Sequence, residues 1–191
     1  MAHRSAAVLV PVKAFDQAKH RLAPALGAAA RADLARSMAT NVVSVAAPLP
    51  VWVVCDDDEV AAWAAEAGAT VLWRPGRGLN AAVSDGVEHL AGLDFDQVIV
   101  AHADLPHAVD LAWVADFDGV TLVPDRHDDG TNVACVPTAA GFRFAYGAQS
   151  FARHQGEAQR LGLALRVERE ARLGWDVDLP ADLATPDWLT L

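Results

Sequence analysis

Short, continuously apolar segments alternate along this chain with longer segments whose apolar residues recur every three or four positions. A short, wholly apolar run is typical of a strand that is buried on both faces, as in a parallel sheet. The longer pattern is typical of a helix with one apolar face. We therefore expect an α/β protein, a three-layer sandwich with a mostly parallel mixed sheet. The clearest strand runs are 6–12, 51–55, 70–73 and 97–101.

The remaining elements follow from the same pattern. We expect further strands at 120–123, 132–136 and 163–167, and helices at 28–47, after Asp56–Asp58, and at 79–90, 108–117 and 149–162. Residues 13–27 contain Pro24 and Gly27 and are expected to form a long loop, with a short helical turn as a possible part of it. No internal repeat or linker interrupts the chain, so residues 1–191 are expected to form a single domain.

Composition narrows the classes of function. The formal net charge of −10 argues against a nucleic-acid partner, because binding a polyanion requires a basic surface. No run approaches the ~18 apolar residues of a membrane span, and the N-terminal apolar stretch is too short for a signal peptide. Cys55 and Cys135 lie in apolar runs and are expected to be buried, reduced thiols. We expect a cytoplasmic protein that acts on small molecules.

Polar residues follow each of the first four expected strands. Lys13 follows the first strand, Asp56 the second, Arg77 the third and Asp104 the fourth. In open α/β sheets, ligands bind at the carboxyl ends of the strands. We therefore expect a single active-site edge that carries these residues.

Three aspartates are candidates for a metal site. Asp104 follows a buried strand, and Mg²⁺ is commonly held by one or two carboxylates together with substrate phosphates. Asp176 and Asp178 alternate with apolar residues, so on an extended segment both carboxylates face the same side. The alternatives are that Asp104 caps a following helix and that Asp176 and Asp178 belong to a solvated face, before a helix that Asp182 helps to start.

Two further groups are candidates for binding phosphates. Lys13, Lys19 and Arg21 can neutralise a triphosphate and the departing pyrophosphate, or they form a solvated basic loop. Gly147 and Ser150 open a helix, where free N–H groups and the helix dipole favour an anion. The alternative there is an ordinary helix N-cap.

Thr131, in the turn Asp129-Gly130-Thr131-Asn132, adds another hydroxyl to this second group. His154 lies one turn after Ser150, and a surface position suits it equally well.

Other chemistries have weaker support. Gly76-Arg77-Gly78-Leu79-Asn80-Ala81 fits the dinucleotide-binding fingerprint, but it follows the third expected strand and Pro75 precedes it. His102 and His107 bracket Asp104 without further ligands for a zinc site. We find no nucleophile with a base arranged beside it.

Several motifs together carry a family resemblance. They are Val10-Pro11-Val12-Lys13, Ala18-Lys19-His20-Arg21-Leu22, Gly78-Leu79-Asn80-Ala81-Ala82, Ala103-Asp104-Leu105-Pro106, Asp129-Gly130-Thr131-Asn132, Ser150-Phe151 with His154, and Asp176-Val177-Asp178 with Asp182-Leu183. In these motifs and their order, nearly the whole chain resembles the family of 2-phospho-L-lactate and phosphoenolpyruvate guanylyltransferases, which acts in biosynthesis of the deazaflavin coenzyme F-420.

The resemblance implies a GT-A-like nucleotidyltransferase fold, also called the nucleotide-diphospho-sugar transferase fold, with GTP as co-substrate and Mg²⁺ as cofactor. The phosphate of a three-carbon acid would attack the α-phosphorus of GTP and release pyrophosphate. A phosphate oxygen is an adequate nucleophile at neutral pH, so no general base is required. Catalysis would consist of positioning and charge neutralisation.

The resemblance also implies roles for individual residues. Thr131, Gly147 and Ser150 would hold the acceptor phosphate, and Gly78 and Asn80 would lie against the nucleotide. The triphosphate would be bound by Lys13, Lys19 and Arg21. Asp104 would bind the metal, with Asp176 or Asp178 as a second ligand. His102 replaces an acid that some related nucleotidyltransferases carry, so the metal is expected to rely more on the C-terminal pair.

Two other functions stay open at this point. One is a related nucleotidyltransferase that acts on a sugar phosphate or cofactor phosphate, and the other is a non-catalytic nucleotide-binding module. The choice between phosphoenolpyruvate and 2-phospho-L-lactate also stays open, because such a small apolar difference rarely exceeds about 1–3 kcal/mol. The chain contains 6 Trp, which leaves room for an apolar interface and a homodimer.

Overall fold

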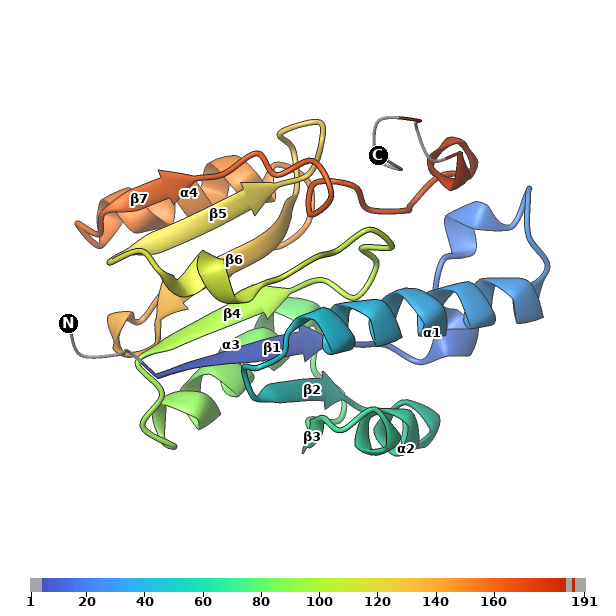
Figure 1. The fold of residues 1–191 in the computed structure, drawn as a ribbon, viewed down its shortest axis with the longest axis horizontal. Coiled ribbons are helices and arrows are strands. Elements are labelled where there is room, and N and C mark those ends of the chain that lie inside the picture. Colours follow the sequence, from blue (N-terminus) through green and yellow to red (C-terminus); the bar gives the residue numbers. More distant parts are fainter. Residues whose placement is uncertain (1–4, 185–186, 188–191) are drawn as a thin grey trace.

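A seven-stranded sheet forms the middle of the molecule in the computed structural model, which describes residues 5–184 and 187 (Figure 1). The strand order is β3-β2-β1-β4-β6-β5-β7. The strands are β1 (Ala6–Pro11), β2 (Val51–Cys55), β3 (Thr70–Trp73), β4 (Gln97–Ala101), β5 (Val120–Pro124), β6 (Thr131–Pro137) and β7 (Leu165–Val167). Each strand expected from the apolar runs is present.

The sheet is mixed, because one strand runs against its neighbours. β1 is parallel to β2 and to β4, β2 is parallel to β3, and β5 is parallel to β7. β6 is antiparallel to both β4 and β5. Its direction is reversed by the tight turn after β5, in which the Asp125 carboxylate accepts hydrogen bonds from the N–H groups of His127, Asp129 and Gly130. Short turns of this kind join antiparallel strands.

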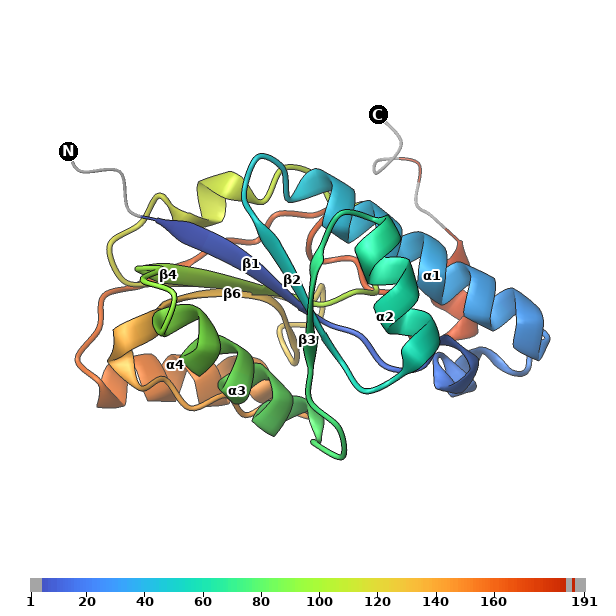
Figure 2. The same cartoon turned by 90° about the horizontal axis from the view of Figure 1, so that it is seen from below.

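Helices cover both faces of the sheet, which gives three layers (Figure 2). α1 (Ala28–Val45) and α2 (Asp58–Glu66) pack on one face, and α3 (Leu79–Ala91) and α4 (Ser150–Arg160) pack on the other. Successive residues of β1 alternate between the two cores, with Val8 and Val10 in the first and Ala7 and Leu9 in the second. This is why a wholly apolar run was the correct signal for a strand buried on both faces.

The helix expected at 108–117 is wrong. Only a 3₁₀ helix forms there, at Ala112–Ala115. Arg166 of β7 donates to the carbonyls of Trp113 and Val114 and so ties this segment to a distant strand. The Asp110 carboxylate also accepts from the N–H of Ala112, which favours a turn.

The expected loop at 13–27 contains two 3₁₀ turns, Phe15–Gln17 and His20–Leu22. We call residues 13–27 the N-terminal arm. Leu22 of this arm packs with Met38 of α1 and with Trp175 and Val177 from the C-terminal segment. Residues near both ends of the chain are therefore packed together beside the sheet.

Two other expectations can be checked in the described residues. Cys55 and Cys135 are both buried and free, as expected. None of the described helices combines the length and apolar character that crossing a bilayer requires.

Two glycine substitutions with opposite effects test the backbone geometry. Gly119 has a φ of 151°, and a Cβ there would lie 2.3 Å from the carbonyl oxygen of Ala164. We expect Gly119→Ala to lower the free energy of unfolding by about 2 kcal/mol, because this contact and the positive φ both oppose a side chain. Urea unfolding measures the change.

Gly156→Ala is the matched control. Gly156 lies in α4, and a Cβ added there would meet nothing within 4 Å. Alanine favours the helix, so this variant is expected to gain about 0.5–1 kcal/mol. Equal effects of the two substitutions would contradict the assigned geometry.

Candidate active site

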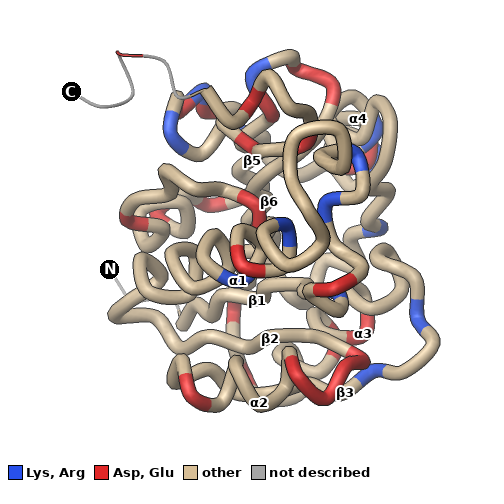
Figure 3. Tube along the Cα trace, turned by 90° about the vertical axis from the view of Figure 1, so that its right-hand side faces the viewer, with Lys and Arg blue, Asp and Glu red and all other residues tan. Residues whose placement is uncertain are grey.

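A cavity of about 370 Å³ opens where the parallel strands β1 and β4 end. It is lined by the N-terminal arm, by Leu79 at the start of α3, by His102–Asp104 and by Asp178. A smaller hollow of about 60 Å³ adjoins it and shares Lys13 and Leu79. Figure 3 faces this edge of the molecule, where both acidic and basic segments lie.

The four residues that follow the first four strands all line one of these two spaces. Lys13 lines both, Asp104 lines the cavity, and Asp56 and Arg77 line the hollow. The carboxyl ends of these strands therefore bring the four residues around two adjoining spaces at one edge of the sheet.

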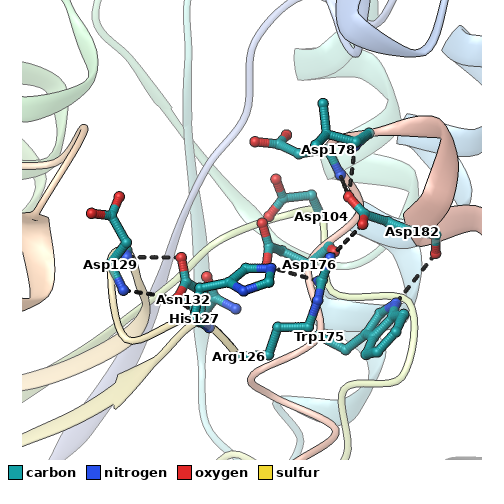
Figure 4. A network of polar contacts seen from close by, with 12 residues as sticks. Asp104, Arg126, His127, Asp129, Asn132, Trp175, Asp176, Asp178 and Asp182 are labelled. Atoms are coloured by element: carbon teal, nitrogen blue, oxygen red, sulfur yellow. Dashed lines mark hydrogen bonds and ion pairs between the residues drawn. The ribbon is translucent and has the colours of Figure 1, made fainter. Parts of the chain in front are cut away.

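Asp104, Asp176 and Asp178 converge on one point beside the cavity (Figure 4). Each offers one carboxylate oxygen, and these oxygens lie within 4.8 Å of one another. The C-terminal segment reaches Asp104 because the N–H of Val177 donates to the Asp104 carbonyl across 3.2 Å. A backbone hydrogen bond thus holds the C-terminal segment against the loop that follows β4, although the two are far apart in the sequence.

A second set of contacts shapes the turn that carries Asp176 and Asp178. The Asp182 carboxylate accepts from the N–H groups of Asp178 and Leu179 at 2.8 and 2.6 Å. Arg126 binds Asp182 and donates to the Asp176 carbonyl at 3.0 Å. Its guanidinium lies 4.3 Å from the ring centroid of Trp175. Figure 4 labels Arg126, Asp182 and Trp175 in this network. Arg126 and Asp182 therefore support the acidic turn.

Lys19 provides the positive charge nearest to Asp104 and Asp178, whereas Asp176 pairs with Arg126 at 3.7 Å. The Nζ of Lys19 lies 2.6 Å from Oδ2 of Asp104 and 3.1 Å from Oδ1 of Asp178. Its backbone is left-handed, with φ of 56°, a conformation uncommon for lysine. Arg21 is more exposed and lies 3.4 Å from Asp178. Lys19 is thus held between two acids of the cluster.

The charges of this site change the pKa of its members. Burial opposes the ammonium of Lys19, but the carboxylates of Asp104 and Asp178 outweigh it and raise the pKa of Lys19. Burial likewise opposes the charge of Asp104, but the ammonium of Lys19 outweighs it and lowers the pKa of that carboxyl. Burial first, and then the charge of Asp104, raises the pKa of Asp176 to about 6.

These residues fit a hard divalent cation such as Mg²⁺. Oδ1 of Asp104 is buried and makes no hydrogen bond within the described part of the chain. The three carboxylates lie close enough together to share one ion, although Lys19, Arg21 and Arg126 also pair with them. Carboxylate oxygens are the ligands that Mg²⁺ prefers.

The segments that carry Thr131, Gly147 and Ser150 lie at the same edge, but none of these three residues lines the cavity or the hollow. The N–H of His102 donates to the Asn132 carbonyl at 2.9 Å, so the start of β6 lies beside the end of β4. The N–H of Phe151 donates to the Asp129 carbonyl at 3.0 Å, which ties the start of α4 to the turn before Thr131. We call Thr131, Gly147 and Ser150 the acceptor loop group.

The start of α3 carries Gly78 and Asn80, the two residues that are expected to contact the nucleotide. Gly78 is the N-cap of α3, directly before Leu79. The Asn80 side chain accepts from the N–H of Tyr146 at 2.6 Å and donates to its carbonyl at 3.4 Å. Asn80 thus holds the segment before Gly147, and Leu79 is the residue that lines both cavity and hollow.

Sequence reasoning missed the contacts that several residues make at this edge. Arg126 and Asp182 had no motif that identified their pairing. Arg153 bonds to the carbonyl of Ala148, and its Nη2 would lie 3.6 Å from a Cβ at Gly147. His154 is fully buried, so the surface position considered for it is wrong. Its helical spacing from Ser150 and Ala158 was the available signal.

Comparisons with known proteins bear on the family and the fold of the chain. A family model described as "Guanylyl transferase CofC like" matches residues 6–185. A phosphoenolpyruvate guanylyltransferase of Sphaerobacter thermophilus is 38% identical over 185 residues, covering 92% of this chain and 89% of that protein. A 2-phospho-L-lactate guanylyltransferase of Methanothermobacter thermautotrophicus is 32% identical, with coverages of 92% and 81%.

A 3-phospho-D-glycerate guanylyltransferase of Phenylobacterium zucineum is 30% identical, with coverages of 93% and 87%. Among solved structures, a protein described as a nucleotide-diphospho-sugar transferase from Desulfovibrio desulfuricans has a TM-score of 0.77 at 16% identity, covering 94% of this chain and 85% of that one. A Methanothermobacter nucleotidyl transferase has a TM-score of 0.65 at 14% identity, with coverages of 95% and 94%. The fold is therefore of the GT-A-like nucleotidyltransferase type.

The raised pKa of Asp176 predicts a stability change without divalent ions. Between the ordinary pKa of an aspartate, about 4, and the value of about 6 here, the folded protein holds a proton that the unfolded chain has released. Stability therefore falls as pH rises through this window. We expect Asp176→Asn in EDTA to raise the free energy of unfolding by about 1–2 kcal/mol at pH 7 and by much less at pH 4.

Urea unfolding at both pH values measures this difference. Asp116→Asn, at an exposed position, is the control and is expected to change neither value. If Asp176→Asn has the same effect at pH 4 and pH 7, the carboxyl does not titrate as described.

Proposed function

The chain belongs to the CofC-like guanylyl transferase family, and we propose that it transfers GMP from GTP to the phosphate of a three-carbon acid. Phosphoenolpyruvate and 2-phospho-L-lactate are the proposed acceptors, with pyrophosphate as the second product. The observation that carries this proposal is the convergence of Asp104, Asp176, Asp178 and Lys19 at the cavity edge. The reaction would belong to coenzyme F-420 biosynthesis.

We propose that Asp104, Asp176 and Asp178 hold Mg²⁺. When bound, the ion neutralises phosphate charge and orients the triphosphate. The unpartnered Oδ1 of Asp104 and the proximity of the other two carboxylates support this assignment. Arg126 and Asp182 orient the segment that carries two of the ligands.

The chain's own cations would bind the triphosphate. Lys13 lies between the cavity and the hollow, and Lys19 and Arg21 line the cavity beside Asp178. Positive groups placed where charge develops on the leaving pyrophosphate stabilise the transition state. Gly78 and Leu79 would lie against the nucleoside, and Asn80 would contribute through the backbone of Tyr146.

Thr131, Gly147 and Ser150 would hold the acceptor phosphate. One of its oxygens forms a bond to the α-phosphorus, and the bond from that phosphorus to the β-phosphate oxygen breaks with its electron pair. Pyrophosphate therefore leaves, and no proton has to be removed from the nucleophile. The step therefore requires no general base at the acceptor loop group.

Pyrophosphate release tests the reaction and the acceptor together. Purified protein is incubated with Mg²⁺ and GTP, and phosphoenolpyruvate, 2-phospho-L-lactate or 3-phospho-D-glycerate is offered in parallel. We expect release that requires one of the first two acids and stops with EDTA. Release only with 3-phospho-D-glycerate or with a sugar phosphate would reject the proposed acceptors. GTP binding without any release would indicate a non-catalytic module.

Asp104→Asn tests the proposed metal site. The change preserves shape but removes the charge that pairs with Lys19. We expect kcat/KM to fall by about a thousandfold or more, because the lost metal interaction contributes several kcal/mol. Glu88→Gln removes a charge from an exposed position of α3 and is expected to leave activity unchanged. Full activity of Asp104→Asn, with a normal circular dichroism spectrum, would refute the assignment.

A further inference from the structure

His154 lies at the centre of a chain of hydrogen bonds in the protein interior. Its ring is fully buried within α4. The backbone N–H of Ala145 donates to Nε2 across 2.9 Å, and Nδ1 lies 3.0 Å from Oγ1 of Thr131. Both ring nitrogens therefore have a hydrogen-bond partner.

The backbone sets the direction of each bond in this chain. An amide N–H can only donate, so Nε2 of His154 must accept from Ala145. In a neutral imidazole, one nitrogen carries the hydrogen and the other accepts. The hydrogen is therefore on Nδ1, which donates to the hydroxyl oxygen of Thr131.

The surroundings of His154 keep its ring neutral. Three aromatic rings surround it with centroid distances of 5.7, 6.0 and 4.9 Å: Phe142, Phe144 and Tyr146. Burial first, and then the charges of His102 and Arg153, lower the pKa of His154 to about 4, against an opposing effect of Glu157. The ring thus carries a single hydrogen at neutral pH.

Thr131 is left with a hydrogen to donate. Its side chain is almost wholly buried, and within residues 5–184 and 187 its hydroxyl has no other hydrogen-bond partner. A hydroxyl has one hydrogen and two acceptor lone pairs, and one lone pair receives the hydrogen from Nδ1. An ionised phosphate offers acceptor oxygens and needs donors.

We propose that His154 is a positioning residue that makes the Thr131 hydroxyl a hydrogen-bond donor to the acceptor phosphate. The inference rests on the proposed function, in which Thr131 binds that phosphate. Helix α4 holds both the ring and the hydroxyl in place. It carries His154, and its N-terminal end is hydrogen-bonded to Asp129, two residues before Thr131. The ring and the hydroxyl are therefore fixed relative to each other.

The hydrogen position on His154 is measured directly by NMR. Two-bond ¹H–¹⁵N correlations of protein labelled with ¹⁵N-histidine distinguish the two ring nitrogens, and the signal that disappears in His154→Asn identifies the residue. We expect the hydrogen on Nδ1 in the protein without substrates at pH 7. A hydrogen on Nε2 would overturn the inference, whatever reaction the protein catalyses.

Two substitutions separate the two bonds of the ring. The amide of His154→Asn lies near the position of Nδ1 and can still donate to Thr131. The longer amide of His154→Gln lies near the position of Nε2 and can accept only from Ala145. We expect His154→Gln to raise the KM of the acceptor acid about 10-fold, whereas His154→Asn stays within about 3-fold, since one hydrogen bond to a charged phosphate is lost only in the first.

A double-mutant cycle distinguishes positioning from a general structural role. In a Thr131→Val background, we expect His154→Gln to change the acceptor KM by less than about 2-fold, because the hydroxyl through which it acts is gone. The KM of GTP should be unchanged throughout. An equal 10-fold effect in both backgrounds, or a matching rise in the KM of GTP, would overturn the inference.

The same experiments separate this inference from the proposed function. If the unsubstituted protein releases no pyrophosphate with any phosphorylated acid, the proposed function fails, and the NMR result decides alone whether the Thr131 hydroxyl is a donor. If the unsubstituted protein is active but His154→Gln matches it, the function stands and the inference fails.

Discussion

The rest of the site depends on the ion pairs of the Lys19 ammonium, because three segments that are distant in the sequence meet at this group. Its Nζ lies 2.6 Å from Asp104, at the end of β4, and 3.1 Å from Asp178, near the C-terminus. Lys19 itself belongs to the N-terminal arm. Without a cation between them, the two carboxylates would repel each other in a half-buried position. The arm and the C-terminal segment therefore take their places around this charge.

The edge of the sheet combines two kinds of polar chemistry. Around Lys19, three carboxylates lie close together, and the pKa of Asp176 rises to about 6 as a result of burial and of the charge of Asp104. Such a cluster is suited to a further cation. Around Thr131, uncharged groups form a chain of hydrogen bonds that runs from the backbone N–H of Ala145 through His154 to the Thr131 hydroxyl. In the proposed reaction, the charged cluster around Lys19 serves the triphosphate, and the hydrogen bonds around Thr131 serve the acceptor phosphate.

The sequence predicted which residues lie at the carboxyl edge of the sheet better than it predicted the contacts that hold them there. Lys13 and Asp104 were expected on one edge because each follows a buried strand, and the rule for open sheets places such residues together. No pattern placed Asp178 beside Lys19, since that proximity depends on the packing of Trp175 against Leu22. The helix expected at 108–117 failed for a similar reason, because Arg166 binds its carbonyls from far along the chain.

The sequence by itself determined the alternation of strands and helices along the chain, apart from the helix expected at 108–117. It also determined which strands are buried on both faces and which edge carries the polar residues. Periodic burial and turn chemistry are local properties, so they can be read from neighbouring residues. Only the tertiary structure decided that Arg126 pairs with Asp182 and that His154 donates to Thr131. Charge pairing and the direction of a hydrogen bond depend on distances between atoms that the chain brings together only when it is folded.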